Sequence, residues 1–173
     1  MTYISVDVEA DGAIPSDYSM ISLGAVVVDS TLDKTFYGQL RPISDNYNPQ
    51  ALAVSGFTRE QTLEFDDPKL VMINFREWLR EVVPQGSKPI FISDNNGFDW
   101  MFVCWYFHHF LGENPFGFSS QNLGSLYKGF IKDMRKNFKH LRKTKHTHNP
   151  VDDAKGNAEA LLAIQKMGLN IKI

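Results

Sequence analysis

The sequence contains a single cysteine and no long apolar run, and both shortages narrow the possible classes of protein. Cys104 cannot form a disulfide within the chain, and one cysteine fits a reducing compartment, so we expect a cytoplasmic protein. The most apolar stretch, 98–110, includes Asp99 and two histidines and is too short to cross a bilayer. The first residues lack the basic and apolar regions of a signal peptide. We therefore expect neither a membrane segment nor a membrane partner.

The sequence also lacks an excess of either positive or negative charge. The formal net charge is -2 over 173 residues, so the chain as a whole lacks the positive charge typical of nucleic-acid binders, although a local patch can bind without it. Apolar residues make up 43% of the chain, which argues against disorder. The sequence has no internal repeat, no low-complexity tract and no linker. We expect residues 1–173 to form one domain.

Two kinds of periodicity predict an α/β fold. Residues 2–9 alternate between apolar and polar side chains, as a strand does. Strands over 21–29 and 34–42 follow after short connections and predict an antiparallel meander, in which Gly24 indicates a bulge or a close approach. Residues 88–93 predict a further buried strand. Helices are expected at 67–82, 97–111 and 151–167, in two pieces within 120–141, and as two short segments within 49–63, the second capped by Thr58.

The first strand carries two carboxylates in an otherwise apolar setting. Asp7 and Glu9 share one face of the strand, about 7 Å apart along it. Like charges this close raise each other's pKa unless a cation lies between them. Taken alone, the pair is explained more simply by a solvent-facing side of the sheet. The choice between that interpretation and a functional site depends on the rest of the chain.

Another acid, Asp99, follows the fourth expected strand. It lies between Phe98 and Trp100 in the first turn of a very apolar helix, where an unpaired charge is costly. The alternative is an acid that complements the helix dipole. Asn95 and Asn96 are better placed to cap this helix, which weakens that alternative.

The last expected helix opens with Asp152 and Asp153, and we expect one of them to cap it. His148 lies five residues before Asp153, in the polar loop that enters the helix. A lone histidine is more often a surface or packing residue. A histidine ahead of an acid that opens a helix is a better candidate for a base.

Three motifs follow one another along the chain: Asp7-Val8-Glu9 on the first expected strand, Asn95-Asn96-Gly97-Phe98-Asp99 after the fourth, and His148 to Asp153 entering the last helix. In this order they resemble the motifs of the DEDDh family of 3′-5′ exonucleases, which belongs to the ribonuclease H-like superfamily. Two weaker similarities, over 20–29 and 49–61, extend the resemblance to nearly the whole chain. Ser55 and Asp94 depart from the pattern, because histidine is frequent in relatives at both positions.

The family spacing selects among the candidates near the last helix. His148 precedes Asp153 by five residues, so Asp153 is preferred to Asp152. His146 lies five residues before Val151 and fails the same test. The resemblance therefore implies His148 as the catalytic general base and a set of four catalytic carboxylates that ligate metal, Asp7, Glu9, Asp99 and Asp153.

The resemblance also implies a fold and an activity. The fold is α/β and ribonuclease H-like, a mixed five-stranded sheet with an antiparallel β-meander, flanked by helices on both faces. The implied activity is metal-dependent removal of nucleoside 5′-monophosphates from the 3′ end of single-stranded RNA or DNA. Two divalent ions, Mg²⁺ or Mn²⁺, suit a ligand set of carboxylates. A near-neutral reference pKa suits His148 for accepting a proton from water.

A basic run lies between Lys128 and Lys145 and leads into the loop of His148. It is either an ordinary solvated surface or a track for a phosphate backbone. The small stand-alone chain is more similar to RNA-trimming members of the family, which favours RNA slightly over DNA. Many relatives are dimers, so the resemblance leaves a homodimer open. The candidate nucleic-acid contacts are Phe57, Asn95, Lys139, Arg142 and Lys143.

Three other functions fit part of the pattern. A ribonuclease H-like endonuclease would share the fold and the metals, but its signature Glu lies on a later helix and it lacks the final histidine motif. A catalytically silent relative would bind nucleic acid without turnover, although the complete set of acids argues against it. An unrelated metal-dependent phosphoesterase would act on small substrates. The products separate these functions, because only an exonuclease releases mononucleotides from a 3′ end.

Overall fold

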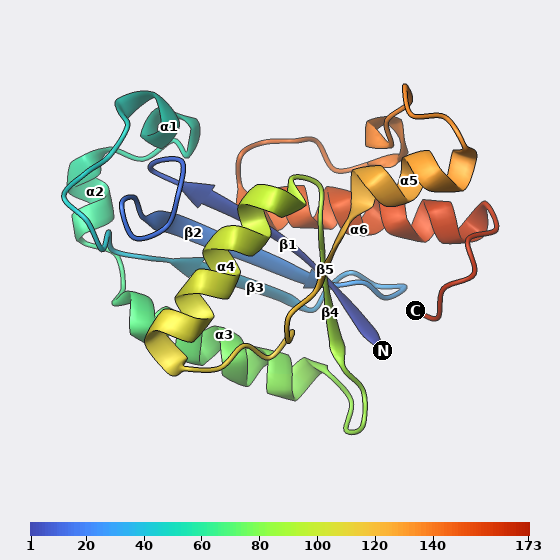
Figure 1. Ribbon diagram of the computed structural model, residues 1–173, viewed down its shortest axis with the longest axis horizontal. Helices are drawn as coiled ribbons and strands as arrows, with labels where there is room; N and C mark the ends of the chain where they lie inside the picture. The colour runs from blue at the N-terminus through green and yellow to red at the C-terminus, as the bar shows by residue number, and fades with distance from the viewer.

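The computed structural model describes all of residues 1–173 and is built around one five-stranded sheet (Figure 1). The strand order across the sheet is β3-β2-β1-β4-β5, so the strand that carries the first two acids lies at its centre. This arrangement confirms the expected mixed sheet. Along the chain the elements are β1 (Thr2–Ala10), β2 (Met20–Val27), β3 (Thr35–Gln39), α1 (Pro49–Val54), α2 (Arg59–Leu63), α3 (Pro68–Val82), β4 (Pro89–Ser93), α4 (Asn96–Leu111), β5 (Ser120–Asn122), α5 (Leu123–Ile131), a 3₁₀ turn (Lys139–Leu141) and α6 (Pro150–Lys166).

The first strand is hydrogen-bonded on both sides. β1 pairs antiparallel with β2, which pairs antiparallel with β3, and this confirms the predicted meander. On its other side β1 pairs parallel with β4, and β4 pairs parallel with β5. A central strand held by two neighbours is a rigid support for side chains that must keep a fixed geometry.

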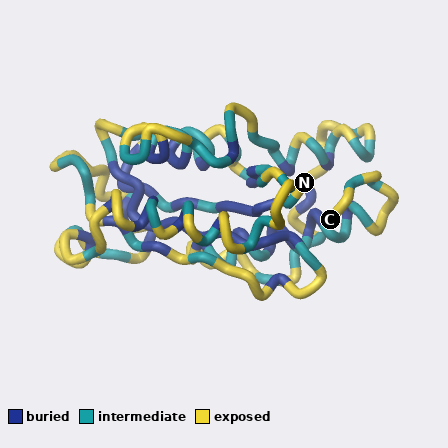
Figure 2. The backbone as a smooth tube through the Cα atoms, turned by 90° about the horizontal axis from the view of Figure 1, so that it is seen from below, coloured by how far each residue is buried: buried dark blue, intermediate teal, exposed yellow.

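Helices cover both faces of the sheet, as expected, and two apolar clusters result. One cluster joins one face of β1 to α3 and α4, with Phe75 and Phe107 at its centre. The other joins the opposite face to α5 and α6 through Leu123 and Leu161. Figure 2 shows the buried strands between the two helical layers. None of the helices is both long enough and apolar enough to cross a membrane.

The segment 120–141 differs from the two helical pieces expected there. Its first three residues form β5, which extends the sheet at its edge by pairing with β4. These residues are Ser, Gln and Asn, so no alternation of apolar and polar side chains marks them as a strand. A single helix, α5, follows and ends at Lys132, whose φ of 57° is left-handed. The second helical piece is the three-residue 3₁₀ turn Lys139–Leu141 rather than an α-helix.

The start of α6 also differs in one detail from its prediction. Asn149 caps the helix, because its side chain accepts from the backbone N–H groups of Val151 and Asp152, and Pro150 occupies the first turn. Asp152 and Asp153 are therefore both inside the first turn, and the prediction that one of them caps was wrong. Their position still complements the positive end of the helix dipole.

Gly24 lets this helix approach the sheet. In the β1–β2 register Gly24 lies opposite Asp7, so both project from the same face. A Cβ atom at Gly24 would overlap the backbone of Pro150 and Val151. The close approach that the sequence indicated is therefore confirmed, and it brings the first turn of α6 next to Asp7.

Replacing Gly24 by alanine is expected to push α6 away from the sheet. Overpacking of this kind costs about 1–3 kcal/mol, which corresponds to roughly 2–4 °C in melting temperature per kcal/mol in a chain of this size. Thermal unfolding measures the loss. Gly129→Ala is the matched control, because no atom lies within 4 Å of a Cβ at Gly129 and alanine favours the helix more than glycine does. Equal melting temperatures for Gly24→Ala and wild type would contradict the steric role.

Candidate active site

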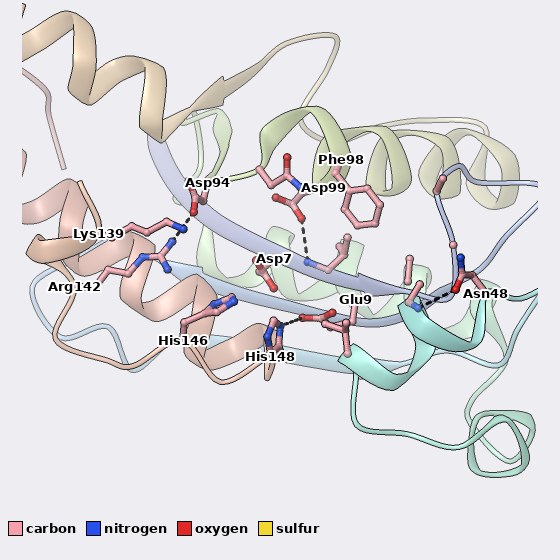
Figure 3. A pocket seen from close by; sticks show the side chains of 17 residues that line it. Asp7, Glu9, Asn48, Asp94, Phe98, Asp99, Lys139, Arg142, His146 and His148 are labelled. Carbon is pink, nitrogen blue, oxygen red and sulfur yellow. Dashed lines mark hydrogen bonds and ion pairs between the residues drawn. The ribbon is translucent and has the colours of Figure 1, made fainter. Parts of the chain in front are cut away.

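A cavity of about 530 Å³ lies over the end of β1 (Figure 3). It is lined by residues from five segments that are far apart in the sequence: β1, the loop at Gly12 and Ala13, α1, the β4–α4 corner, and the segment 139–148. The acids of β1 lie in the middle of the view in Figure 3, with α1 at one end and Lys139 and Arg142 at the other. The cavity thus joins the three sequence motifs.

Three of the four predicted acids converge. The carboxylate oxygens of Asp7, Glu9 and Asp153 lie within 4.8 Å of one another. Asp7 and Glu9 share the face of β1 that α6 covers, and Asp153 reaches them from the first turn of that helix. Asp152 takes no part, because its carboxylate accepts from the Thr147 hydroxyl at 3.0 Å.

The fourth acid, Asp99, reaches the cavity from the first turn of α4 and is only 2% exposed. Its Oδ1 atom accepts the backbone N–H of Val8 at 3.3 Å, so Asp99 is tied to the strand residue between the other two acids. Its Oδ2 atom is buried and makes no close hydrogen bond, although the Ser93 hydroxyl lies near enough to lower the pKa of the carboxyl somewhat against the effect of burial. A buried carboxylate oxygen without a donor is costly unless a cation lies beside it.

Burial and mutual repulsion raise the pKa values of these acids. Burial raises the pKa of Asp7 well above its ordinary value, and the charges of Asp99 and Glu9 raise it further, while Arg142 opposes the shift. Burial likewise raises the pKa of Glu9 to about 7 and that of Asp99 to about 7. Each shift shows that the protein alone holds this cluster poorly in its charged form.

Backbone donors fix Asp153 and with it the loop that carries His148. Thr147 donates its backbone N–H to Oδ1, and His148 donates its own to Oδ2, each at 3.1 Å. His148 has a φ of 60°, a left-handed backbone conformation that residues other than glycine rarely adopt. The resulting turn brings Nδ1 of His148 to 3.6 Å from Oε1 of Glu9. The histidine is 46% exposed and lines the cavity.

Arg142, predicted as a nucleic-acid contact, is largely buried and bonded to other side chains of the protein. Its Nη2 atom donates to Oδ2 of Asp94 at 2.9 Å and also to the side-chain oxygen of Asn157. The guanidinium lies over the ring of Phe138, 5.1 Å from its centre, and the side chain is 9% exposed. Arg142 borders the cavity but its charge is mostly used within the protein.

The other predicted nucleic-acid contacts divide into two groups. Asn95 and Lys139 are exposed and line the cavity. Lys143 is exposed but lies outside the cavity lining, and its backbone N–H donates to Glu159. Phe57 also lies outside the lining, because its ring packs edge-on against Phe65 with 5.0 Å between ring centres. The structure therefore does not bring Phe57 and Lys143 to the site.

Several lining residues were missed by the sequence analysis. Phe98, inside a recognised motif, presents an aromatic ring to the cavity, and Val54 of α1 lies in the same lining. His146, which failed the spacing test, lies with Nδ1 2.8 Å from Oδ2 of Asp153. The spacing test counts residues along the chain and pairs His146 with Val151. In the folded protein the loop before α6 turns back, and this turn brings His146 to the carboxylate of Asp153 instead. Ser55 is buried and donates its hydroxyl to Leu52, outside the cavity lining.

The donor set fits hard divalent cations. Carboxylate oxygens are the ligands that Mg²⁺ and Mn²⁺ prefer, and a cation would neutralise the repulsion among the acids. The unpartnered Oδ2 atom of Asp99 is one independent sign that a ligand belongs here. Asp7, Glu9 and Asp153 are placed close enough together to share a divalent ion, and Asp99 lines the same cavity.

Comparison with known proteins supports one family. No family model matches the chain. The chain is 42% identical over 129 residues to the 3′-5′ DNA exonuclease Cap18 of Escherichia coli, a match that covers 73% of this chain and 68% of that protein.

Solved structures share the fold at lower identity. The nuclease domain of 3′hExo, a DEDDh family member bound to rAMP, has a TM-score of 0.79 and 18% identity, covering 99% of this chain and 95% of that one. E. coli exonuclease I in complex with a dA16 oligonucleotide has a TM-score of 0.73 and 16% identity, covering 96% of this chain and 41% of that one. These likenesses confirm the expected α/β architecture.

Removing one buried negative charge is expected to stabilise the protein when divalent ions are absent. Folding raises the pKa values of Glu9 and Asp99 to about 7, so the folded protein holds protons on these carboxyls that the unfolded chain has already released. The free energy of unfolding is therefore highest below pH 4, where both states are protonated, and it falls as the pH rises from 4 towards 7. Asp99→Asn should therefore melt higher than wild type at pH 8 with a chelator, by roughly 2–4 °C or more, and this difference should shrink steadily as the pH falls and become small near pH 4.

The exposed Asp66→Asn, whose carboxylate has no partner, is the matched control and should show no such gain. Adding Mg²⁺ at pH 8 should stabilise wild type more than Asp99→Asn. A chelated wild type that is as stable as Asp99→Asn at pH 8 would show that the acids do not repel one another.

The neighbouring acids of α6 provide a second test. Mn²⁺ should raise the melting temperature of Asp152→Asn as it does that of wild type, whereas Asp153→Asn should lose most of the rise, because only Asp153 joins the cluster. A titration of each chelator-treated protein followed by thermal unfolding gives the result. Equal responses from the two variants would exclude Asp153 as a ligand.

Proposed function

The chain belongs to the DEDDh family of 3′-5′ exonucleases, and from that premise we propose that it removes nucleoside 5′-monophosphates one at a time from single-stranded nucleic acid. The observation that carries the proposal is the meeting of three carboxylates: oxygens of Asp7, Glu9 and Asp153 lie within 4.8 Å of one another, and Asp7, Glu9 and Asp99 line the same cavity. The whole chain, 1–173, acts as one exonuclease domain. The homodimer that the resemblance allows stays a prediction.

Each of the four acids has the same task in this proposal. Asp7, Glu9, Asp99 and Asp153 would hold two divalent ions, Mg²⁺ or Mn²⁺, which lower the pKa of water and stabilise the leaving 3′-oxygen. Asp7 and Glu9 would hold their share of the ions from the central strand β1, whereas Asp99 and Asp153 would do so from the first turns of α4 and α6.

His148 is the general base. It accepts a proton from the attacking water, for which a half-exposed imidazole beside the carboxylates is suitably placed. Glu9, whose nearest oxygen lies 3.6 Å from Nδ1, orients the ring and stabilises the imidazolium that forms. The left-handed turn at His148 holds the base in position, together with the two hydrogen bonds that the backbone N–H groups of Thr147 and His148 donate to Asp153.

The two ends of the cavity suit different parts of a nucleotide chain. Phe98 and Val54 offer apolar surface near α1 for the terminal base and sugar. Lys139 offers positive charge at the other end for a backbone phosphate. Asn95, exposed in the same lining, offers an amide that can bond to a polar edge of the substrate.

We place DNA ahead of RNA as the substrate. The support is the 42% identity to a protein named as a DNA exonuclease, which is more specific than the similarity in size to RNA-trimming members that favoured RNA. Discrimination between the two depends on a contact with the 2′-hydroxyl. Asn95 and the carboxylates are the lining polar groups that such a contact would use.

The activity is tested on 5′-labelled single strands of DNA and RNA with the same sequence, each with Mg²⁺ or Mn²⁺. We expect a ladder that shortens from the 3′ end, runs faster on DNA, and disappears with chelator or in Asp7→Asn. His148→Ala should lower kcat by about 10²–10⁴, the usual contribution of a general base, and should retain Mn²⁺ binding.

His140→Ala is the control, because His140 lies outside the cavity and packs against Tyr127. Internal cuts in a circular single strand would favour the endonuclease, and binding without turnover would favour the silent relative. Faster shortening of the RNA strand would reverse the order of substrates while leaving the mechanism unchanged.

A further inference from the structure

Two histidines lie against one carboxylate at the edge of the cavity. Nδ1 of His146 is 2.8 Å from Oδ2 of Asp153, and the rings of His146 and His148 lie edge to face with 4.4 Å between their centres. One ligand atom from each of the three residues lies within 4.8 Å of the others. Both rings are about half exposed, at 52% and 46%, and both line the cavity, so an ion from solvent can reach them (Figure 3).

These donors have a different preference from that of the four carboxylates. Imidazole nitrogen is a favoured ligand of Zn²⁺ and a poor one for Mg²⁺, which prefers oxygen. Two imidazoles and one carboxylate, with a fourth position left open, form a donor set typical of zinc. Glu9, 3.6 Å from His148, adds negative charge beside that open position.

The local geometry needs only small movements to close around such an ion. Zinc bonds of about 2.0–2.2 Å in a tetrahedron put the ligand atoms about 3.3–3.6 Å apart. Here Nδ1 of His146 lies 2.8 Å from Oδ2 of Asp153, and the three ligand atoms all lie within 4.8 Å of one another. The backbone is already fixed, because the N–H groups of residues 147 and 148 are bonded to Asp153. The adjustment would fall on the two imidazole rings, which are about half exposed.

We propose that His146, His148 and Asp153 form a Zn²⁺ site that overlaps the catalytic one, and that zinc bound there stops hydrolysis. The inhibitory half rests on the proposed function. A neutral imidazole has one lone pair, so His148 cannot both ligate zinc and accept a proton from water. Asp153 is likewise withdrawn from the Mg²⁺ ligands. Because imidazole nitrogen binds Zn²⁺ well and Mg²⁺ poorly, excess Mg²⁺ does not displace zinc from the two histidines.

The experiment titrates Zn²⁺ into the chelator-treated full chain in excess Mg²⁺ and follows binding by calorimetry. Co²⁺ replaces Zn²⁺ in a parallel titration, and its visible spectrum reports nitrogen ligation. His146→Ala and the more conservative His146→Asn should each weaken Zn²⁺ binding at least about tenfold, the smallest loss expected on removing a group that supports a metal. The same variants should raise by the same factor the Zn²⁺ concentration that halves hydrolysis. His140→Ala, outside the cavity, should leave both values unchanged.

Each outcome decides one claim. If His146→Ala and His146→Asn bind Zn²⁺ as tightly as wild type, or if wild type binds none, the site does not exist. If binding depends on His146 but no hydrolysis is seen with any metal, the site stands and the proposed function falls. If binding depends on His146 and zinc fails to inhibit an active enzyme, the inhibitory half is overturned. Unfolding curves show that the variants are folded, which the exposure of His146 leads us to expect.

Discussion

Repulsion among buried carboxylates is the constraint on which the rest of the structure depends. Asp99 is buried and Asp7 is half-buried, and the charges of Asp99, Glu9 and Asp153 all raise the pKa of Asp7. A chain free to relax would move such groups apart or expose them. Here each acid is held by an element that cannot move easily: a strand paired on both sides, or the first turn of a helix packed on the sheet. The stability of the surrounding fold therefore maintains a site that is unfavourable without cations.

Backbone groups, rather than side chains, make most of the contacts that position the acids. Val8 donates its N–H to Asp99, and the loop before α6 donates two N–H groups to Asp153. Gly24 removes the side chain that would separate α6 from the sheet, directly beside Asp7 in the register. These contacts position oxygen atoms without placing a positive side chain among them. Such a side chain would compete with a metal ion for the same oxygens.

The sequence predicts what depends on periodicity and local chemistry. Alternation in residues 2–9 gave the central strand and the shared face of Asp7 and Glu9, and the Thr58 capping box was confirmed in the structure. Non-local pairing was less predictable. β5 is three polar residues that form a strand only because β4 lies beside them. The cap at Asn149 and the contact of His146 with Asp153 depend on how the loop turns, which spacing along the chain does not reveal.

Arg142 shows why a basic run cannot be assigned to substrate from sequence alone. Asp94 stands where histidine is frequent in relatives, and its carboxylate receives the guanidinium of Arg142, which Asn157 and Phe138 hold from other sides. The departure at position 94 and the cation 48 residues later thus form one unit. Because its charge is compensated there, Arg142 shapes the cavity wall and moderates the charge at Asp7. Lys139, exposed in the same lining and without such a partner, is left to face a phosphate.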